Sequence, residues 1–237
     1  MVRLRFDYGA GMSNAMTRDR WVEAALGKIP AGWRLLDVGA GEQPYRRFCG
    51  HLNYVAQDLG EYDGTGDGVG LQQGQWAVAV DIVSDLAEIP EADGSFDAVL
   101  CTEVLEHIPD AVVAVREFGR LVRPGGALIL TAPFASLTHQ APYHFSTGFS
   151  RYWYESHLPA FGFRIDEITA NGNYFDFVAQ EQRRVAEVAE RYGAGTPTAL
   201  DRVASALVLR LLARLSARGD ASSELLAFGW HVRATRE

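Results

Sequence analysis

Apolar runs of strand length alternate with helix-like segments over most of this chain. Candidate strands lie at 34–38, 52–57, 79–84, 96–101, 127–132 and 163–169, and helices are predicted at 14–28, 111–122 and 148–160. Several runs, most clearly 127–130, are apolar without a break, which is typical of strands that are covered on both faces. The alternation therefore predicts an α/β fold built on a doubly wound, mostly parallel sheet.

Two segments interrupt this alternation. Residues 60–74 contain six glycines, which predicts a mobile loop where a crossover helix would be expected. Residues 175–218 predict two helices, with Thr196 as the cap of the second and Pro197 at its first position. A final strand is expected at 224–233. We expect one domain over 1–237, with a core at about 21–170 and a helical insertion at about 175–218.

Composition narrows the class of protein. The net charge of −8 over 237 residues disfavours binding to nucleic-acid phosphates, which depends mainly on Lys and Arg. The two cysteines, Cys49 and Cys101, have no zinc-finger or disulfide-framework spacing and fit a reducing compartment. We see no signal peptide, and the apolar stretch 203–215 is short and interrupted by arginines. We therefore expect a cytoplasmic protein without membrane insertion.

A glycine-rich turn follows the first strand. Residues 35–41 read LLDVGAG, and Gly39 and Gly41 would let the backbone approach a nucleotide-like ligand, although turns also recruit glycine for conformational reasons alone. Asp58 ends the second strand roughly 20 residues later, where a carboxylate can accept both hydroxyls of a ribose. Asp85 ends the next strand and could contact an adenine amino group or cap a turn.

Together with Asp58, four segments resemble the class I S-adenosylmethionine-dependent methyltransferases of the small-molecule type: 35–41 (LLDVGAG), 84–90 (SDLAEIP), 94–110 (GSFDAVLCTEVLEHIPD) and 121–133 (LVRPGGALILTAP). The resemblance implies a seven-stranded Rossmann-like sheet whose last strand is antiparallel, with S-adenosyl-L-methionine as cofactor. The cofactor residues that it implies are Asp37, Gly39 and Gly41 for the methionine part, Asp58 for the ribose, Asp85 and Leu86 for the adenine, and Cys101, Thr102 and Glu103 near the sulfonium. Pro44 stands where a dinucleotide fingerprint has Gly or Ala, which counts against an oxidoreductase.

The segment after the fourth strand reads Glu-x-x-Glu-His. In a helix, Glu103, Glu106 and His107 would share a face and could hold Mg²⁺ or Mn²⁺. This segment resembles the metal sites of certain quinone-pathway and RNA 2′-O-methyltransferases. The alternative is a packing or cofactor-side role without a metal.

Two further histidines, His139 and His144, follow the fifth strand, and a neutral imidazole there could take a proton from a methyl acceptor. We predict His144 as the catalytic base and His107 as the second candidate, and we expect at least one of His139 and His144 to be a surface residue. The aromatic side chains around His144 suit sugars, quinones or phenols, although about half should belong to the core.

The sequence thus predicts O-methylation of a small molecule such as a sugar, glycan, quinone or phenol. The alternatives are an NAD(P)-dependent oxidoreductase and a non-catalytic regulator that binds S-adenosylmethionine. The helices at 176–218 could serve as a lid, a homodimer face or cover for the core, and we favour partial cover of the acceptor site.

Overall fold

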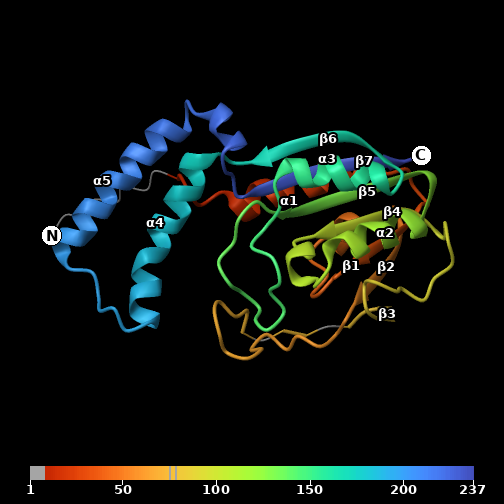
Figure 1. Cartoon of the computed structure of the whole chain (residues 1–237), viewed down its shortest axis with the longest axis horizontal. Coiled ribbons are helices and arrows are strands. Elements are labelled where there is room, and N and C mark those ends of the chain that lie inside the picture. The colour runs from red at the N-terminus through yellow and green to blue at the C-terminus, as the bar shows by residue number, and fades with distance from the viewer. Residues whose placement is uncertain (1–8, 75, 78) are drawn as a thin grey trace. The chain divides into compact units, whose positions relative to one another are not determined.

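The computed structural model describes residues 9–74, 76, 77 and 79–237 (Figure 1). By its contacts the chain divides into two compact units, where the sequence suggested one domain with an insertion. Among the described residues, the smaller unit joins 9–17 with 170–228, and the larger joins 18–169 with 229–237. None of the helices in the described residues is both long and apolar enough to cross a bilayer.

The seven-stranded sheet has the order β3-β2-β1-β4-β5-β7-β6. Its strands are β1 (Arg34–Val38), β2 (Asn53–Asp58), β3 (Ile82–Val83), β4 (Phe96–Thr102), β5 (Val122–Pro133), β6 (Phe163–Asn171) and β7 (Gly229–Arg236). The pairs β1–β2, β1–β4, β2–β3 and β4–β5 are parallel, and β7 runs antiparallel to β5. The expected doubly wound sheet with an antiparallel last strand is confirmed.

Helices cover both faces of this sheet, as continuous apolar strands require. On one face, Val22 and Leu26 of α1 (Asn14–Leu26) pack in a cluster with Leu35 and Ile129. On the other lie α2 (Ala111–Leu121) and α3 (Arg151–Ala160) (Figure 1). The short helices η1 (Arg46–Phe48) and η2 (Leu105–His107) follow β1 and β4. The carboxyl ends of β1, β2, β4 and β5 therefore meet at one edge, where ligands of such sheets bind.

The smaller unit contains α4 (Tyr174–Arg191), α5 (Ala199–Ser216) and η3 (Asp220–Glu224). Leu212 of α5 packs with Ala179 of α4. The expected cap of α5 at Thr196 is wrong by two residues. Thr198 caps the helix, because its hydroxyl accepts the Asp201 amide while Asp201 bonds back to the Thr198 amide, a reciprocal pair that Thr196 does not form.

Two strands also differ from the expectation. The edge strand β3 has two residues in place of six, because it pairs only with Gln57 and Asp58 of β2. The last strand begins at Gly229 and not at 224, since 220–224 form η3. A Cβ at Gly229 would lie 2.5 Å from the Ala132 carbonyl oxygen, so glycine permits the close start of this strand. As expected, the described residues of 60–74 contain no helix.

Candidate active site

The glycine turn, residues 39–41, lies at the carboxyl end of β1. Gly39 and Gly41 have φ of 59° and 50°, and a Cβ at Gly39 would lie 2.6 Å from Val104. The Gly41 amide donates to Asp58 Oδ2 at 2.9 Å, and the Gly60 amide donates to Asp58 Oδ1 at 2.8 Å. The structure therefore brings Asp58 to the glycine turn and fixes its carboxylate there.

Gln57 is a residue of this site that the sequence did not single out. Its side chain is buried, with Oε1 accepting the Gly39 amide at 3.3 Å and Nε2 donating to the Ser84 carbonyl at 2.7 Å. It thereby ties the glycine turn to the segment that precedes Asp85. The only sequence signal was a polar residue at the end of an apolar strand.

The other expected cofactor residues differ in burial and in the hydrogen bonds that they already make. Asp85 Oδ1 accepts the Ala87 amide at 2.8 Å, which is the turn-capping role, and Leu86 is buried. The Cys101 side chain is fully buried in the core, so at that residue only the backbone can contact a ligand. Asp37 is also buried and accepts the Tyr54 hydroxyl at 2.5 Å, and burial raises its pKa to about 7.

The Glu-x-x-Glu-His segment does not start a helix at Glu103. Glu103 has φ of 54°, and its carboxylate accepts the Thr131 hydroxyl at 2.9 Å and pairs with Arg18 of α1 at 3.1 Å. The expected single face of Glu103, Glu106 and His107 is therefore not formed. Arg18 lies 85 positions earlier in the chain, and nothing in the local motif pointed to it.

The structure instead places three histidines together. His107, His139 and His144 form a group, called here the histidine cluster, in which one ring nitrogen from each lies within 4.8 Å of the others. The ring centroids of His107 and His139 are 4.7 Å apart, and those of His139 and His144 are 4.9 Å apart. Glu106 joins the group, since its Oε1 is 3.8 Å from His107 Nε2 and 3.9 Å from His139 Nε2. Both candidate bases thus lie in one site, at the carboxyl ends of β4 and β5.

Backbone carbonyls orient two of these rings. His107 Nδ1 bonds to the Tyr143 carbonyl oxygen, and His139 Nδ1 bonds to the Leu137 carbonyl oxygen at 2.9 Å. A carbonyl oxygen only accepts, so each Nδ1 carries the proton and each Nε2 keeps its lone pair. The amide of Phe145, next to His144, donates to the Glu106 carbonyl at 2.9 Å, which joins the histidine loop (134–148) to η2.

Burial shifts the pKa of three groups in this site. It lowers the pKa of His107 to about 4, and burial together with electrostatic repulsion between the His144 and His139 imidazoles lowers the pKa of His144. Both imidazoles are therefore neutral near pH 7. Burial and the nearby Glu103 carboxylate raise the pKa of Glu106 well above its usual value. Its Oε2 makes no hydrogen bond to the described residues, and neither do His107 Nε2 and the two ring nitrogens of His144.

The glycine loop, residues 60–74, is docked on the histidine loop. The Leu71 amide donates to the Thr138 carbonyl at 2.9 Å, and the Gln140 amide donates to the Leu71 carbonyl at 2.8 Å. A Cβ at Gly70 would lie 2.4 Å from the Thr138 carbonyl oxygen, and one at Gly66 would lie 1.9 Å from that of Ala141. Glycine at these positions is thus needed for the close approach of the two loops on either side of His139.

Aromatic residues of the histidine loop and α3 divide between core and surface. Phe149 and Tyr154 are buried and pack with Trp153, whereas Phe145 and Tyr152 are exposed by 52% and 63%. Phe145 is therefore the exposed aromatic residue that follows His144 in the chain.

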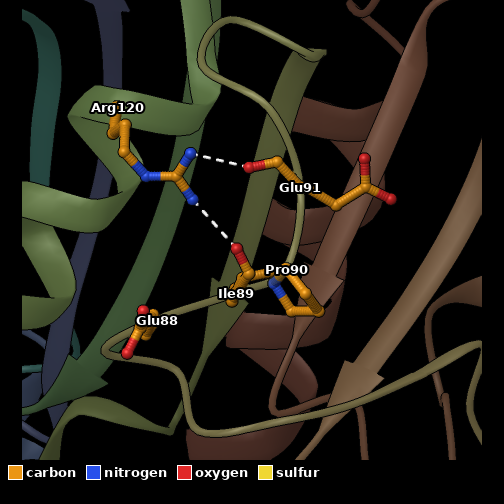
Figure 2. Close-up of a pocket in the computed structure, with 5 residues that line it drawn as sticks. All are labelled: Glu88, Ile89, Pro90, Glu91 and Arg120. Atoms are coloured by element: carbon orange, nitrogen blue, oxygen red, sulfur yellow. Dashed lines mark hydrogen bonds between the residues drawn. The ribbon is translucent and has the colours of Figure 1, made fainter.

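A pocket at the opposite edge of the sheet contains none of these residues. Figure 2 shows it lined by Glu88, Ile89, Pro90, Glu91 and Arg120. Arg120 donates to the Ile89 and Glu91 carbonyls at 2.9 and 2.7 Å, and Glu91 pairs with Arg34 at the start of β1. The Arg120 guanidinium thus binds the segment that precedes β4, and we interpret the pocket as a structural feature.

Comparisons with known proteins agree with this arrangement. A family model described as a methyltransferase domain matches residues 36–130. Ubiquinone biosynthesis O-methyltransferase from Xanthomonas oryzae pv. oryzae is 41% identical over 105 residues, which is 43% of each chain. The protein of the same name from Pseudomonas aeruginosa is 35% identical over 118 residues, covering 48% of this chain and 49% of that one. The match thus spans less than half the length of these curated relatives.

Among solved structures, the [4+2]-cyclase SpnF has a TM-score of 0.55 at 18% identity, covering 95% of this chain and 84% of its own. Haemonchus contortus phosphoethanolamine N-methyltransferase 2, in complex with S-adenosyl-L-methionine, has a TM-score of 0.52 at 17% identity, covering 93% and 52%. These likenesses show the fold.

Proposed function

Because this chain belongs to the class I S-adenosylmethionine-dependent methyltransferase family, we propose that it transfers the methyl group of S-adenosyl-L-methionine to a hydroxyl oxygen of a small molecule. One observation carries the proposal. The glycine turn with Asp58 and the histidine cluster lie at the same carboxyl edge of one mostly parallel sheet. A cofactor site and a proton acceptor thus open on one crevice.

For the cofactor, we propose that Asp58 accepts the ribose hydroxyls, because each of its oxygens keeps a free lone pair beside its backbone bond. Gly39 and Gly41, with Asp37, would contact the methionine part. Asp85 and Leu86 would border the adenine. Thr102 and Glu103, with the Cys101 backbone, would lie nearest the sulfonium, where the Glu103 carboxylate favours a positive charge.

In the reaction, an acceptor oxygen attacks the methyl carbon in line with the carbon–sulfur bond. The new oxygen–carbon bond forms as the old bond breaks, its electron pair stays on sulfur, and S-adenosylhomocysteine leaves as a neutral thioether. The hydroxyl proton must go to a base. We propose His144 for this role, since its two ring nitrogens make no hydrogen bond to the described residues, and His107 as the second candidate.

Of the acceptor classes considered, an aromatic hydroxyl has the stronger support. The similar curated proteins are named ubiquinone biosynthesis O-methyltransferases, and Phe145, which follows His144 in the chain, has an exposed aromatic side chain. A sugar hydroxyl remains the second candidate, because aromatic faces also suit sugar rings.

The test combines calorimetry with labelled methyl transfer. We expect S-adenosylhomocysteine to bind with one site per chain, and label from S-adenosylmethionine to appear in a catechol or other phenol sooner than in a sugar panel. Binding of NAD(H) in place of S-adenosylhomocysteine would favour the oxidoreductase. Tight S-adenosylhomocysteine binding without transfer to any acceptor would favour the regulator.

A further inference from the structure

We propose that Trp76 and the glycine loop that precedes it form a cover over the cofactor site, in which the indole stacks on the nucleoside of S-adenosyl-L-methionine. The inference rests on the proposed function, because it assigns a further residue to the binding of the same cofactor. Trp76 lies outside the four segments that carry the resemblance to known methyltransferases. The assignment therefore depends on the structure of this chain.

The indole of Trp76 lies directly on the glycine turn. A Cβ at Gly41 would lie 2.4 Å from Trp76 Cζ2 and 3.1 Å from Cη2, so only glycine lets the six-membered ring approach the backbone this closely. The amide of the same glycine donates to Asp58, the proposed ribose acceptor. Trp76 and Asp58 thus both contact Gly41, and the indole borders the place proposed for the nucleoside.

The surroundings of Trp76 favour ligand binding over core packing. Its side chain is only partly buried, it belongs to no helix or strand, and the Tyr62 ring contacts it edge-on with centroids 6.0 Å apart. An indole offers a large flat face, and aromatic side chains stack on any nucleobase because every base has a π-face. Cofactor binding would lift the ring from the turn and exchange that contact for one with the adenine.

Hydrogen bonds hold the chain on both sides of Trp76. Before it, the Gly74 amide donates to the Gly64 carbonyl at 2.9 Å, which closes the glycine loop on itself. After it, Gln43, two residues beyond the glycine turn, donates through Nε2 to the Ala79 carbonyl at 2.5 Å. The indole is thus carried by a segment that is attached next to the cofactor site.

The same loop also contacts the acceptor side of the crevice. The Tyr143 hydroxyl donates to Glu61 Oε2 at 3.0 Å, and the Asp67 amide donates to the Ala141 carbonyl at 3.1 Å. These bonds add to the pairing of the two loops described above. A cover attached at both sides can exclude water from the methyl group while it is transferred.

The cover is tested with S-adenosylhomocysteine and the full chain, by calorimetry and tryptophan fluorescence. In the wild type, binding should change the emission, because the Trp76 indole leaves the turn and stacks on adenine. Trp76→Phe keeps an aromatic face, so its affinity should fall less than about fivefold while most of the change in emission is lost. Trp76→Ala should weaken binding by about 10-fold or more.

Trp33→Phe is the matched control for the fluorescence. Trp33 precedes β1 at the end of that strand opposite to the glycine turn, and the guanidinium carbon of Arg123 lies 4.7 Å from its ring centre. The control variant should keep both the affinity of the wild type and its change in emission.

Gly64→Ala tests the loop that carries the indole. Its Cβ would lie 1.7 Å from the Gly74 carbonyl oxygen and 2.9 Å from Trp76 Cβ, so the closed loop must open. S-adenosylhomocysteine affinity should then fall about as far as in Trp76→Ala. Gly68→Ala has a similar positive φ and nothing within 4 Å of its Cβ, so it should keep the wild-type affinity.

Three results would overturn the inference. Trp76→Ala could bind S-adenosylhomocysteine as tightly as the wild type, or more tightly, which would make the indole an obstruction and not a cover. Trp76→Phe could keep the whole change in emission. Hydrogen exchange of the wild-type chain needs no variant, and amides of residues 60–74 that exchange equally fast with and without ligand would also refute the cover.

The inference and the proposed function fail separately. A wild-type chain that binds no S-adenosylhomocysteine in calorimetry would refute the cofactor site itself. Binding that is independent of Trp76 and of the glycine loop would refute only the cover and leave the methyltransferase function standing.

Discussion

The Asp58 carboxylate accepts the backbone amide of Gly41 at 2.9 Å, which joins the end of β2 to the turn after β1. The same carboxylate also accepts the Gly60 amide at 2.8 Å, so it is held at the first residue of the glycine loop. One side chain thus fixes two backbone segments of the proposed cofactor site. Its geometry is set before any ligand binds, which lowers the cost of ordering the site on binding.

Asp58→Ala should weaken S-adenosylhomocysteine binding by about 2–3 kcal/mol, because the variant loses the proposed ribose acceptor and frees the Gly41 amide. Calorimetry measures the change. Asp93→Ala, which removes an exposed carboxylate paired with Arg120 at the other edge of the sheet, is the matched control. An affinity unchanged in Asp58→Ala would refute the ribose assignment.

His144→Ala should lower kcat by about 10²–10⁴-fold while leaving S-adenosylhomocysteine affinity nearly intact, because the variant loses the proposed base. Initial rates and calorimetry measure the two quantities. A wild-type rate in His144→Ala, together with an inactive His107→Ala, would refute the assignment and place the base in the Glu-x-x-Glu-His segment.

The sheet could be predicted from the sequence because its signals are local. Unbroken apolar runs end at glycines or acids, and β1 has the bounds that these signals predicted. The observed bounds differ from the predicted ones where contacts with another segment determine where an element begins or ends. The edge strand β3 has only β2 to pair with, and the cap of α5 is decided by the reciprocal bond between Thr198 and Asp201.

The site was harder to predict because it depends on contacts distant in sequence. The motif contained Glu106 and His107, but the positive φ of Glu103 and its pairing with Arg18 prevent the helical face that the spacing suggested. His139 pairs through its backbone with Leu71 of the glycine loop, and this pairing holds it in the site. The sequence predicted only that the glycine loop is mobile. No local pattern encodes that pairing.

Gly66→Ala should destabilise the docking of the glycine loop on the histidine loop. Its Cβ would lie 1.9 Å from the Ala141 carbonyl oxygen, so the loops must separate, at a cost of about 1–3 kcal/mol. Gly68→Ala is the control, because it has a similar positive φ with nothing within 4 Å of its Cβ. Thermal unfolding and proteolysis of residues 60–74 should distinguish the two variants, and equal effects would mean that backbone strain alone is responsible.

Asp37→Asn should change how stability depends on pH. Burial raises the pKa of Asp37 to about 7 from a value of 3.8, while the Tyr54 hydroxyl bond opposes the shift and the charge of Asp58 adds to it. A carboxyl whose pKa is raised by folding stabilises the folded state below pH 4, and this contribution is lost as the pH rises through 7. At 1.36 kcal/mol per pKa unit, the loss of stability is about 4 kcal/mol.

The Asp37→Asn variant keeps an acceptor for Tyr54 and removes the charge. Its free energy of unfolding should therefore fall less between pH 4 and 7 and exceed that of the wild type at pH 8. Chemical denaturation at several pH values without cofactor measures both curves, and parallel curves would show that Asp37 titrates as an ordinary carboxyl.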